Sequence, residues 1–357
     1  MFYTFLYPLA PKLFNLLKYQ TFRTGAALMT ALILCLLMGP FVIRFLKGKS
    51  GQPIRTNGPE THLKKQGTPT MGGVMILFSL FVSVLLWGDL RNTYIWILLF
   101  TTGGLGLLGF ADDYLKIIKH NSAGVSFWKK IFWQTLISFI SVYWIVSVSS
   151  SPIATGLIFP FFKNLVMELG FFYIVLGVLV IIGSSNAVNL TDGLDGLVSV
   201  PLIMANLVFV VITYLAGNAI FANYLQIHYV PGIGELAVFG GAVMGAVLGF
   251  LWYNAPPAQI FMGDTGSLSL GGALGAMAIA TKHEIVLVIV GGLFVAEAVS
   301  DILQVGSYKL RKKRIFKMAP IHHHFEKSGW PETRVVVRFW IISIILALLG
   351  LSTLKIR

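Results

Sequence analysis

The chain has 357 residues, of which 56% are hydrophobic and only 11% are charged. Soluble domains carry about 25% charged residues, so a protein with most of its surface in water is excluded. A net charge of +13 would suggest nucleic acid in a soluble protein. Here the basic residues flank long apolar runs, where membrane orientation and anionic lipid headgroups account for them. We therefore expect membrane lipids as partners and no nucleic acid.

The chain opens with a mixed segment, residues 1–23, in which Phe, Leu and Tyr occur with Lys12, Lys18 and Arg23. We interpret it as an amphipathic helix in the membrane interface, with a short, imperfect span as the alternative. Ten apolar runs long enough to cross a bilayer follow. Their approximate limits are 24–46, 71–88, 94–111, 131–149, 170–187, 197–216, 235–253, 266–281, 285–305 and 336–354. The sequence thus predicts an all-α integral membrane protein, a single polytopic domain over residues 1–357.

The basic residues are distributed unequally between the two sets of connecting loops. The loops after the first, third and ninth runs hold most of the Lys and Arg, including a dense cluster at 309–317. By the positive-inside rule these loops face the cytoplasm, and ten spans then place both termini outside. The cytoplasmic loops are expected at about 47–70, 112–130, 188–196, 254–265 and 306–335.

Five of the seven aspartates fall where this orientation puts the cytoplasmic ends of the runs. A carboxylate near a bilayer is costly, so each is a functional candidate by default. They are Asp112, Asp113, Asp192, Asp195 and Asp264. Their convergence requires compensating cations, which are either nearby lysines or a hard divalent cation such as Mg²⁺.

The first acidic pair lies in the segment 109–116. On a helix, the neighbours Asp112 and Asp113 point about 100° apart and need not share one ligand. Asp112 and Lys116, four residues apart, do share a face. A metal-binding carboxylate beside an ammonium that meets phosphate suits the handling of a diphosphate. An ordinary ion pair at a loop end is the alternative.

Three more segments carry polar groups in the same set of loops. Asn189, Asp192 and Asp195 recur every three residues and could line one face, for amide and hydroxyl recognition or for Mg²⁺; a polar turn is the alternative. Two prolines break the helix before Phe261, which could stack on a nucleobase or simply anchor the interface. The three consecutive histidines 322–324 diverge on a helix, so hydrogen bonding to phosphate or a carboxylate fits them better than zinc; a solvated histidine run is the alternative.

The ninth run combines glycines with acids. Gly291 and Gly292 permit bending. Glu297 and Asp301 follow, four residues apart. These acids either pair with neighbouring spans or serve the path by which a lipid reaches the site.

With Gly67–Gly73, these segments resemble the phospho-N-acetylmuramoyl-pentapeptide-transferase family of glycosyltransferase family 4, within the polyprenyl-phosphate N-acetylhexosamine-1-phosphate transferase superfamily. The match covers nearly the whole chain. The resemblance implies a ten-helix fold in the bacterial cytoplasmic (inner) membrane, usually a homodimer, with periplasmic termini and a ninth helix bent to open a lipid groove. It implies UDP-MurNAc-pentapeptide and undecaprenyl phosphate as substrates, and lipid I and UMP as products.

The resemblance also implies roles for individual residues. The family's catalytic and Mg²⁺-binding aspartates match Asp112, Asp113 and Asp264, with Asp264 the best metal ligand. The nucleoside pocket matches Asn189, Asp192, Asp195, Asn254 and Phe261. Positions near the phosphates match Lys65, Thr70, Lys116 and Lys129, although Lys130 is an equally basic neighbour. The histidine motif, expected at the sugar-phosphate end, matches His322, His323 and His324.

Two rival functions follow from the same residues. One is a related transferase that uses UDP-GlcNAc, against which the segment Ala319–Phe325 favours the muramoyl-pentapeptide branch. The other is a secondary transporter, whose acids should lie near the middle of its spans rather than at their ends. For the transferase we expect direct attack by the lipid phosphate, with Asp112 orienting it or accepting its proton. A covalent intermediate on an aspartate is the competing scheme.

Overall fold

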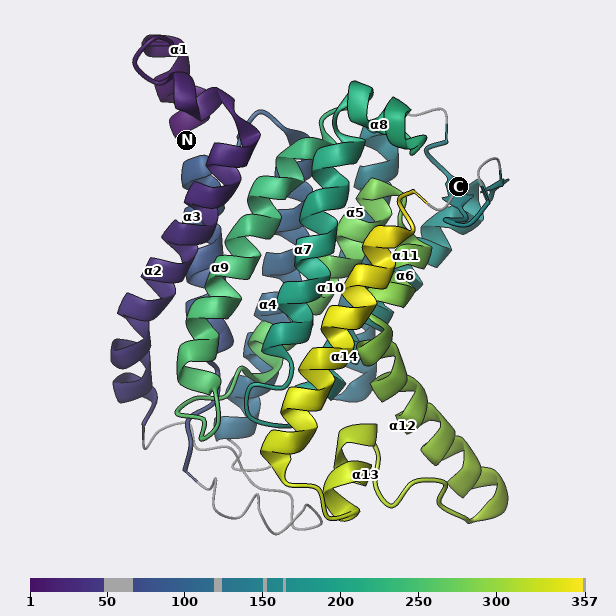
Figure 1. The fold of residues 1–357 in the computed structure, drawn as a ribbon. Helices are drawn as coiled ribbons and strands as arrows, with labels where there is room; N and C mark the ends of the chain where they lie inside the picture. The colour runs from purple at the N-terminus through teal and green to yellow at the C-terminus, as the bar shows by residue number, and fades with distance from the viewer. Residues whose placement is uncertain (48–66, 119–123, 150–152, 163–164, 356–357) are drawn as a thin grey trace.

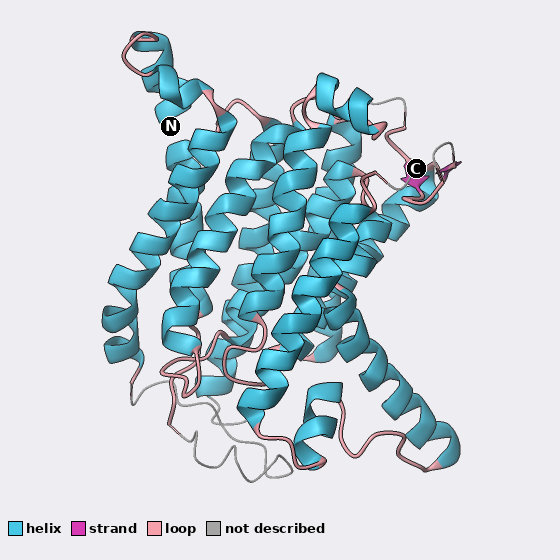
Figure 2. Cartoon of the chain, viewed as in Figure 1, coloured by secondary structure: helices cyan, strands magenta, loops and turns pink. Residues whose placement is uncertain are grey.

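Helices make up nearly all the regular structure of the computed structural model, which describes residues 1–47, 67–118, 124–149, 153–162 and 165–355 (Figures 1 and 2). The long elements are α2 (Gln20–Leu46), α3 (Gly73–Trp87), α4 (Thr93–Ile118), α5 (Phe127–Val148), α6 (Phe171–Thr191), α7 (Ser199–Ala216), α9 (Leu236–Asn254), α10 (Gly263–Thr281), α12 (Gly292–Arg311) and α14 (Glu332–Ser352). The short ones are η1 (Phe2–Leu6), α1 (Tyr7–Leu9), η2 (Asn15–Lys18), α8 (Ala219–Leu225), η4 (Ile233–Glu235), α11 (Glu284–Val290) and α13 (Ile321–Lys327). The strands β1 (Gly156–Ile158) and β2 (Val166–Glu168) form an antiparallel hairpin in which Leu157 faces Met167.

Each predicted apolar run is helical, but the count of ten spans is not confirmed. Within the described residues, seven helices are long and apolar enough to cross a membrane, and a bent pair would make an eighth. The run 71–88 is the shorter helix α3, and the run 266–281 is α10, which is rich in Gly, Ala and Ser. Residues 265–281 of α10 are all buried inside the bundle, so this helix needs no lipophilic surface.

The ninth run is not one straight helix. The chain breaks at Gly291, and α11 and α12 meet at an angle of 83°. The bend that the glycines permit is therefore present. Figure 1 shows α12 running away from the other helices at the end where α13 lies.

The amphipathic helix predicted over residues 1–23 is wrong as a single element. The segment forms the three short helical pieces η1, α1 and η2, and α2 begins at Gln20. Pro11 accounts for the break after α1, because proline lacks the N–H that a continuing helix requires. Apolar side chains such as Phe5 and Leu9 remain exposed on these pieces, which fits a place at a lipid surface.

The most extensive contact between two helices brings α9 against α2 through a row of glycines. A Cβ added at Gly245 would lie 2.0 Å from the carbonyl oxygen of Leu28, and one at Gly249 would lie 2.9 Å from that of Leu32. The facing stripe of α2 is also small, since Ala27 and Ala31 are fully buried there. Small residues on both helices let the two backbones touch, which is how helices associate where lipid removes the hydrophobic driving force.

A buried ion pair fastens the end of the bundle at which both chain termini lie (Figure 1). The guanidinium of Arg23 donates two hydrogen bonds of 2.6 Å to the carboxylate of Glu235, before α9. The backbone N–H of Asp89 and the amide of Gln20 also donate to Glu235, and the ring of Tyr3 covers Arg23 at 4.2 Å. The pair therefore joins the N-terminal segment, α2, the loop after α3, and α9.

We predict that Glu235→Ala destabilises the protein by about 3–5 kcal/mol, because it leaves the buried charge of Arg23 without a partner. Thermal unfolding in detergent measures the effect. Lys18→Ala removes an exposed cation from the same segment and should leave the transition unchanged. The double variant Arg23→Met/Glu235→Leu should recover most of the loss; if it is less stable than Glu235→Ala, the uncompensated charge is not the cause.

We also predict that Gly245→Ala costs about 1–3 kcal/mol, since the new methyl group forces α9 away from α2. Gly183→Ala on α6 is the matched control, because a Cβ there has nothing within 4 Å. The control should be neutral or slightly stabilising, since alanine favours a helix more than glycine does. Equal transition temperatures for the two variants would contradict the close packing.

Candidate active site

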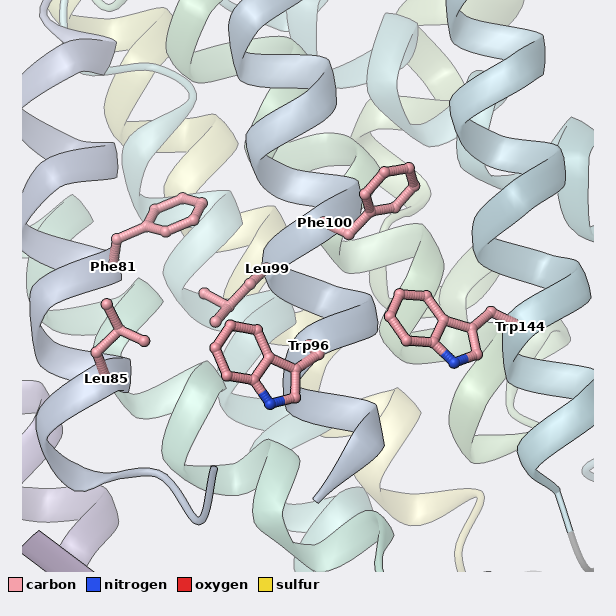
Figure 3. A pocket seen from close by; sticks show the side chains of 6 residues that line it. All are labelled: Phe81, Leu85, Trp96, Leu99, Phe100 and Trp144. Carbon is pink, nitrogen blue, oxygen red and sulfur yellow. The ribbon is translucent and has the colours of Figure 1, made fainter. Parts of the chain in front are cut away.

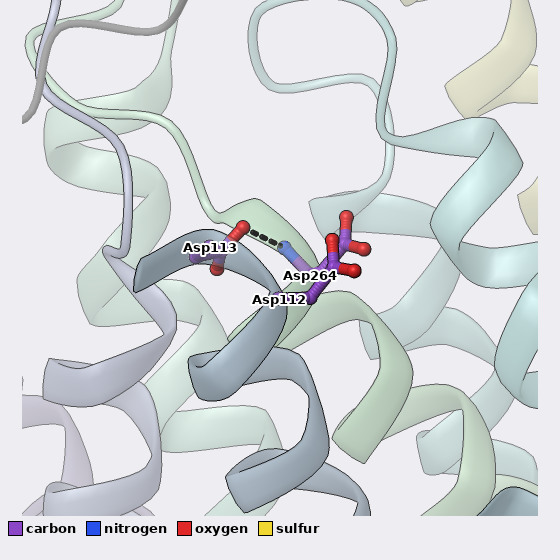
Figure 4. A group of neighbouring side chains, drawn as sticks. All are labelled: Asp112, Asp113 and Asp264. Carbon is purple, nitrogen blue, oxygen red and sulfur yellow. Dashed lines mark hydrogen bonds between the residues drawn. The ribbon is translucent and has the colours of Figure 1, made fainter. Parts of the chain in front are cut away.

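Three carboxylates meet where α4 ends and α10 begins (Figure 4). Oxygen atoms of Asp112, Asp113 and Asp264 lie within 4.8 Å of one another. The predicted convergence of these acids is therefore confirmed. Two of them are buried, and Asp264 is partly exposed.

Two glycines make this approach possible. A Cβ at Gly109 would lie 2.2 Å from the backbone oxygen of Asp264, so only glycine lets α4 touch α10 here. Gly263 begins α10 with a φ of 74°, and a Cβ there would lie 2.6 Å from Oδ2 of Asp113 and 3.0 Å from Oγ1 of Thr70. Left-handed backbone and lack of space both require glycine at that position.

Asp113 caps α10. Its carboxylate accepts hydrogen bonds from the backbone N–H groups of Asp264 (3.1 Å) and Thr265 (2.9 Å), and from the Thr265 hydroxyl (2.7 Å). A carboxylate at a helix N-terminus also meets the positive end of the helix dipole. Asp113 thus fixes the backbone that presents Asp264, and the adjacent acids have separate surroundings, as the helical geometry predicted.

Two lysines neutralise the other carboxylates. Lys116 lies 2.6 Å from Oδ2 of Asp112, which confirms the predicted pair four residues apart, and 3.3 Å from Oδ2 of Asp264. Lys130 lies 2.7 Å from the same oxygen of Asp264. Lys129, the residue chosen from the sequence, is exposed. The structure therefore gives the second cation to Lys130, because its position on α5 is the one that faces α10.

Asn189 and Asp192 approach the same centre from the end of α6. The amide nitrogen of Asn189 donates to Oδ1 of Asp264 (2.8 Å) and to the hydroxyl of Ser267 (2.8 Å). Asp192 receives the backbone N–H of Gly263. Burial raises the pKa of the Asp192 carboxyl well above its usual range, and the negative charges of the neighbouring aspartates raise it further.

The single face predicted for Asn189, Asp192 and Asp195 is wrong. The helix ends at Thr191, so the spacing of three continues as a turn rather than as a helical face. Asp195 turns toward other segments: its carboxylate accepts the N–H of Ala258 (2.9 Å), and its own N–H donates to Glu332 at the start of α14 (3.0 Å).

Asn254 also organises a loop. Its side-chain oxygen accepts the N–H of Gly196 (2.9 Å), and its amide nitrogen donates to the backbone oxygen of Ile260 (2.9 Å). With only 2% of its surface exposed, Asn254 shapes the loop behind the predicted pocket.

A short backbone pairing brings Thr70 to the site. The N–H of Phe261 donates to Pro69, and the N–H of Gly72 donates back to Phe261 (2.9 and 2.8 Å). This pairing sets Thr70, which is buried, against Gly263. The ring of Phe261 is partly exposed. Lys65 lies outside the described residues.

The three histidines point to three different partners, as their divergence on a helix predicted. Nδ1 of His322 lies 3.0 Å from Glu297, and both side chains are completely buried. His323 pairs with Glu326 at 2.7 Å. Nδ1 of His324 accepts the backbone N–H of Lys317 at 3.1 Å. Three histidines that separate in this way do not form one zinc site.

The donor set of the acidic cluster fits a hard divalent cation. Carboxylate oxygens are the ligands that Mg²⁺ prefers, and Asp112 and Asp264 present theirs beside two ammonium groups that could meet phosphate. Asp113 shares its oxygens with the N-terminus of α10, so its first role is to hold Asp264.

The sequence left several contributors unassigned: Gly109, Lys130, Thr265 and Ser267. Gly109 and Lys130 lie within the predicted segments 109–116 and 112–130. Identifying them as site residues requires knowing how α4 and α5 are rotated, which the sequence does not give. Thr265 and Ser267 lie in the first turn after Asp264. Polar residues at the start of an otherwise apolar helix are a sequence signal that could have identified them.

An apolar groove elsewhere on the bundle does not belong to this site. It is lined by Phe81, Leu85, Trp96, Leu99, Phe100 and Trp144, from α3, α4 and α5 (Figure 3). Trp96 lies near the start of α4, whereas Asp112 lies near its end. The groove faces outward and suits lipid chains rather than a charged substrate.

Comparison with known proteins gives the same assignment as the motifs. The model of Glycosyl transferase family 4 matches residues 95–282, which include all three clustered aspartates, and the Phospho-N-acetylmuramoyl-pentapeptide-transferase signature 1 matches residues 65–77. The Phospho-N-acetylmuramoyl-pentapeptide-transferase of Granulibacter bethesdensis is 59% identical over 362 residues, which cover 100% of both chains. That of Pelagibacter ubique is 59% identical over 345 residues, 96% of each chain. The chain therefore belongs to glycosyl transferase family 4 and, within it, to the phospho-N-acetylmuramoyl-pentapeptide-transferases.

Proposed function

We propose that this membrane protein transfers phospho-MurNAc-pentapeptide from UDP-MurNAc-pentapeptide to undecaprenyl phosphate. The products are lipid I and UMP, and the reaction is the first membrane step of peptidoglycan synthesis. The observation that carries the proposal is the meeting of three carboxylates with Lys116 and Lys130 at one end of the bundle. Such a set can hold a metal-bound diphosphate, and the full-length relatives support the choice of substrates.

We propose Mg²⁺ as the cofactor. Asp264 and Asp112 would hold it, with Asp113 behind them. When bound, it supplies positive charge that stabilises the diphosphate as charge accumulates there during transfer. The rest of the chemistry belongs to the side chains around it.

The lysines stabilise charge on the phosphates. A phosphate monoester with a second pKa of about 6 is largely dianionic at neutral pH, so an acceptor lipid phosphate needs little help from a base. Its oxygen attacks the β-phosphorus of the UDP-sugar, forming the new P–O bond as the bond to UMP breaks. In this proposal Lys116 and Lys130, which lie beside Asp264, meet the phosphate oxygens that gain charge.

Asp112 supports direct attack rather than a covalent intermediate. One of its oxygens pairs with Lys116 (2.6 Å), and the other accepts the backbone N–H of Val125 (2.8 Å). Both contacts engage the carboxylate oxygens, one of which a covalent mechanism would need for attack on phosphorus. Asp112 then orients the acceptor or takes its remaining proton.

The remaining polar groups select the substrate. We assign the partly exposed ring of Phe261 to stacking on uracil, and Asn189 and Asp192 to the same nucleoside pocket. His323 and His324 of α13, which are partly exposed, suit the sugar-phosphate end. Asp195 and Asn254 act indirectly, by holding in place the loops to which they are hydrogen-bonded.

The basic loops support an orientation with this site in the cytoplasm and both termini in the periplasm. The family resemblance supports a homodimer in the bacterial inner membrane. The termini lie at one end of the bundle and α13 at the other (Figure 1), as this orientation requires.

The test of the function is purified protein in detergent with UDP-MurNAc-pentapeptide, undecaprenyl phosphate and Mg²⁺, with release of UMP and lipid product followed together. We expect Mg²⁺-dependent formation of lipid I, and Asp264→Asn should lower kcat by at least about 10²-fold, since it removes a central charge. Full activity of Asp264→Asn would move the metal to Asp112 or Asp192. Turnover of UDP-GlcNAc in place of the muramoyl substrate would assign the chain to the related branch.

The two adjacent lysines of α5 provide a matched pair. Lys130→Met should lower kcat by about 10²-fold, because it removes the ammonium 2.7 Å from Asp264. Lys129→Met removes the same charge from an exposed position and should change kcat by no more than about twofold, as expected for a surface charge. The reverse order in the same assay would show that Lys129, as first expected from the sequence, meets the substrate.

A further inference from the structure

A buried acid–base pair joins α12 to α13. Oε2 of Glu297 is 3.0 Å from Nδ1 of His322, and neither side chain has exposed surface. Glu297 belongs to α12, shortly beyond the bend, and His322 belongs to α13. Burial of a carboxylate is costly, so this pair needs a reason beyond filling space.

The far edge of the His322 ring packs against backbone. A Cβ added at Gly193 would lie 2.3 Å from Nε2 and 2.9 Å from Cε1 of that ring. Nε2 has no hydrogen-bond partner among the described residues. The ring therefore acts as a spacer between the carboxylate of Glu297 and the turn that contains Gly193.

That turn carries one of the site's acids. Gly193 follows Asp192, whose carboxylate receives the N–H of Gly263, the first residue of α10. A continuous line of contacts thus runs from Glu297 through the imidazole and the turn to the start of α10.

Apolar side chains pack around the contacts between Glu297, His322 and Gly193. A small apolar cluster, separate from the main core, packs Leu194 of the turn with Leu293 at the start of α12 and Phe339 of α14. Phe325 of α13 packs on this cluster and stacks on Trp330 at 4.7 Å. A shift of the His322 imidazole would therefore also move the turn that contains Gly193.

We propose that Glu297 is a positioning residue, which fixes the tautomer and orientation of His322 so that the ring sets the turn bearing Asp192. The pair ties the substrate-binding end of α6 to the helix beyond the 83° bend. His322 is then not a residue that meets the sugar phosphate, unlike the partly exposed His323 and His324. The inference rests on the proposed transferase function, since its readout is that reaction.

The test is a double-variant cycle on the full-length protein in detergent, with kcat and KM for UDP-MurNAc-pentapeptide measured at saturating Mg²⁺. In Glu297→Gln the amide can either donate or accept, so it no longer selects one tautomer. We expect kcat about 10- to 100-fold lower with KM changed less, by analogy with the loss of partners that orient metal-bound histidines. In a His322→Ala background, Glu297→Gln should have no further effect.

Lys309→Met is the control, because it removes one charge from an exposed position on the same helix. It should keep the wild-type kcat. Thermal unfolding of each variant separates loss of position from loss of fold: Glu297→Gln should melt near the wild type. Wild-type kcat in Glu297→Gln, or effects that multiply in the double variant, would overturn the proposal.

Gly193→Ala tests the contact between the His322 ring and the turn. It replaces the first test if Glu297→Gln does not fold. The added methyl group meets Nε2, so we expect a loss of kcat similar to that of His322→Ala. The double variant Gly193→Ala/His322→Ala should be no worse than His322→Ala alone, since the ring is gone. Independent effects would contradict the spacer role. Absence of lipid product from the wild type would refute the proposed function instead.

Discussion

The structure depends on holding like charges together at the end of a membrane bundle. Two carboxylates about 4 Å apart repel by about 4 kcal/mol where the effective dielectric constant is near 20. The chain offsets this with two ammonium groups, with the N-terminus of α10 and with the amide of Asn189, all directed at Asp112, Asp113 or Asp264. The arrangement remains anionic enough to attract a divalent cation and basic enough to accept its phosphate ligands.

Glycine residues let the α-helices approach closely enough to bring these charged groups together. Where Gly109 touches the backbone of Asp264, α4 and α10 approach more closely than side chains would allow, and the acids of both helices come within ligand distance. Gly245 serves the same purpose between α9 and α2. A bundle in lipid gains little from burying apolar surface, so close backbone contact stabilises it and also shapes its site.

The sequence predicted the helices and the ends at which the acids gather, because apolar length and the cost of buried charge are local properties. It also predicted the pair of Asp112 and Lys116, which depends only on helical periodicity. It did not separate Lys129 from Lys130, since that choice depends on how α5 is rotated against α10. It assigned Asp195 to a helical face, although α6 ends before it at Thr191. Errors arose where a tertiary contact or a helix terminus overrides periodicity.

The two ends of the bundle hold their charges in different ways, and the difference follows from their tasks. Arg23 and Glu235 satisfy each other directly, in a bidentate pair that joins several segments. At the other end, Lys116 lies near two carboxylates at once, so neither acid has an exclusive partner. Shared partners can be exchanged for a metal ion and phosphate at low cost, whereas an exclusive buried pair cannot. A fixed clamp therefore suits the end that only holds the helices, and shared charges suit the end where substrates must enter and leave.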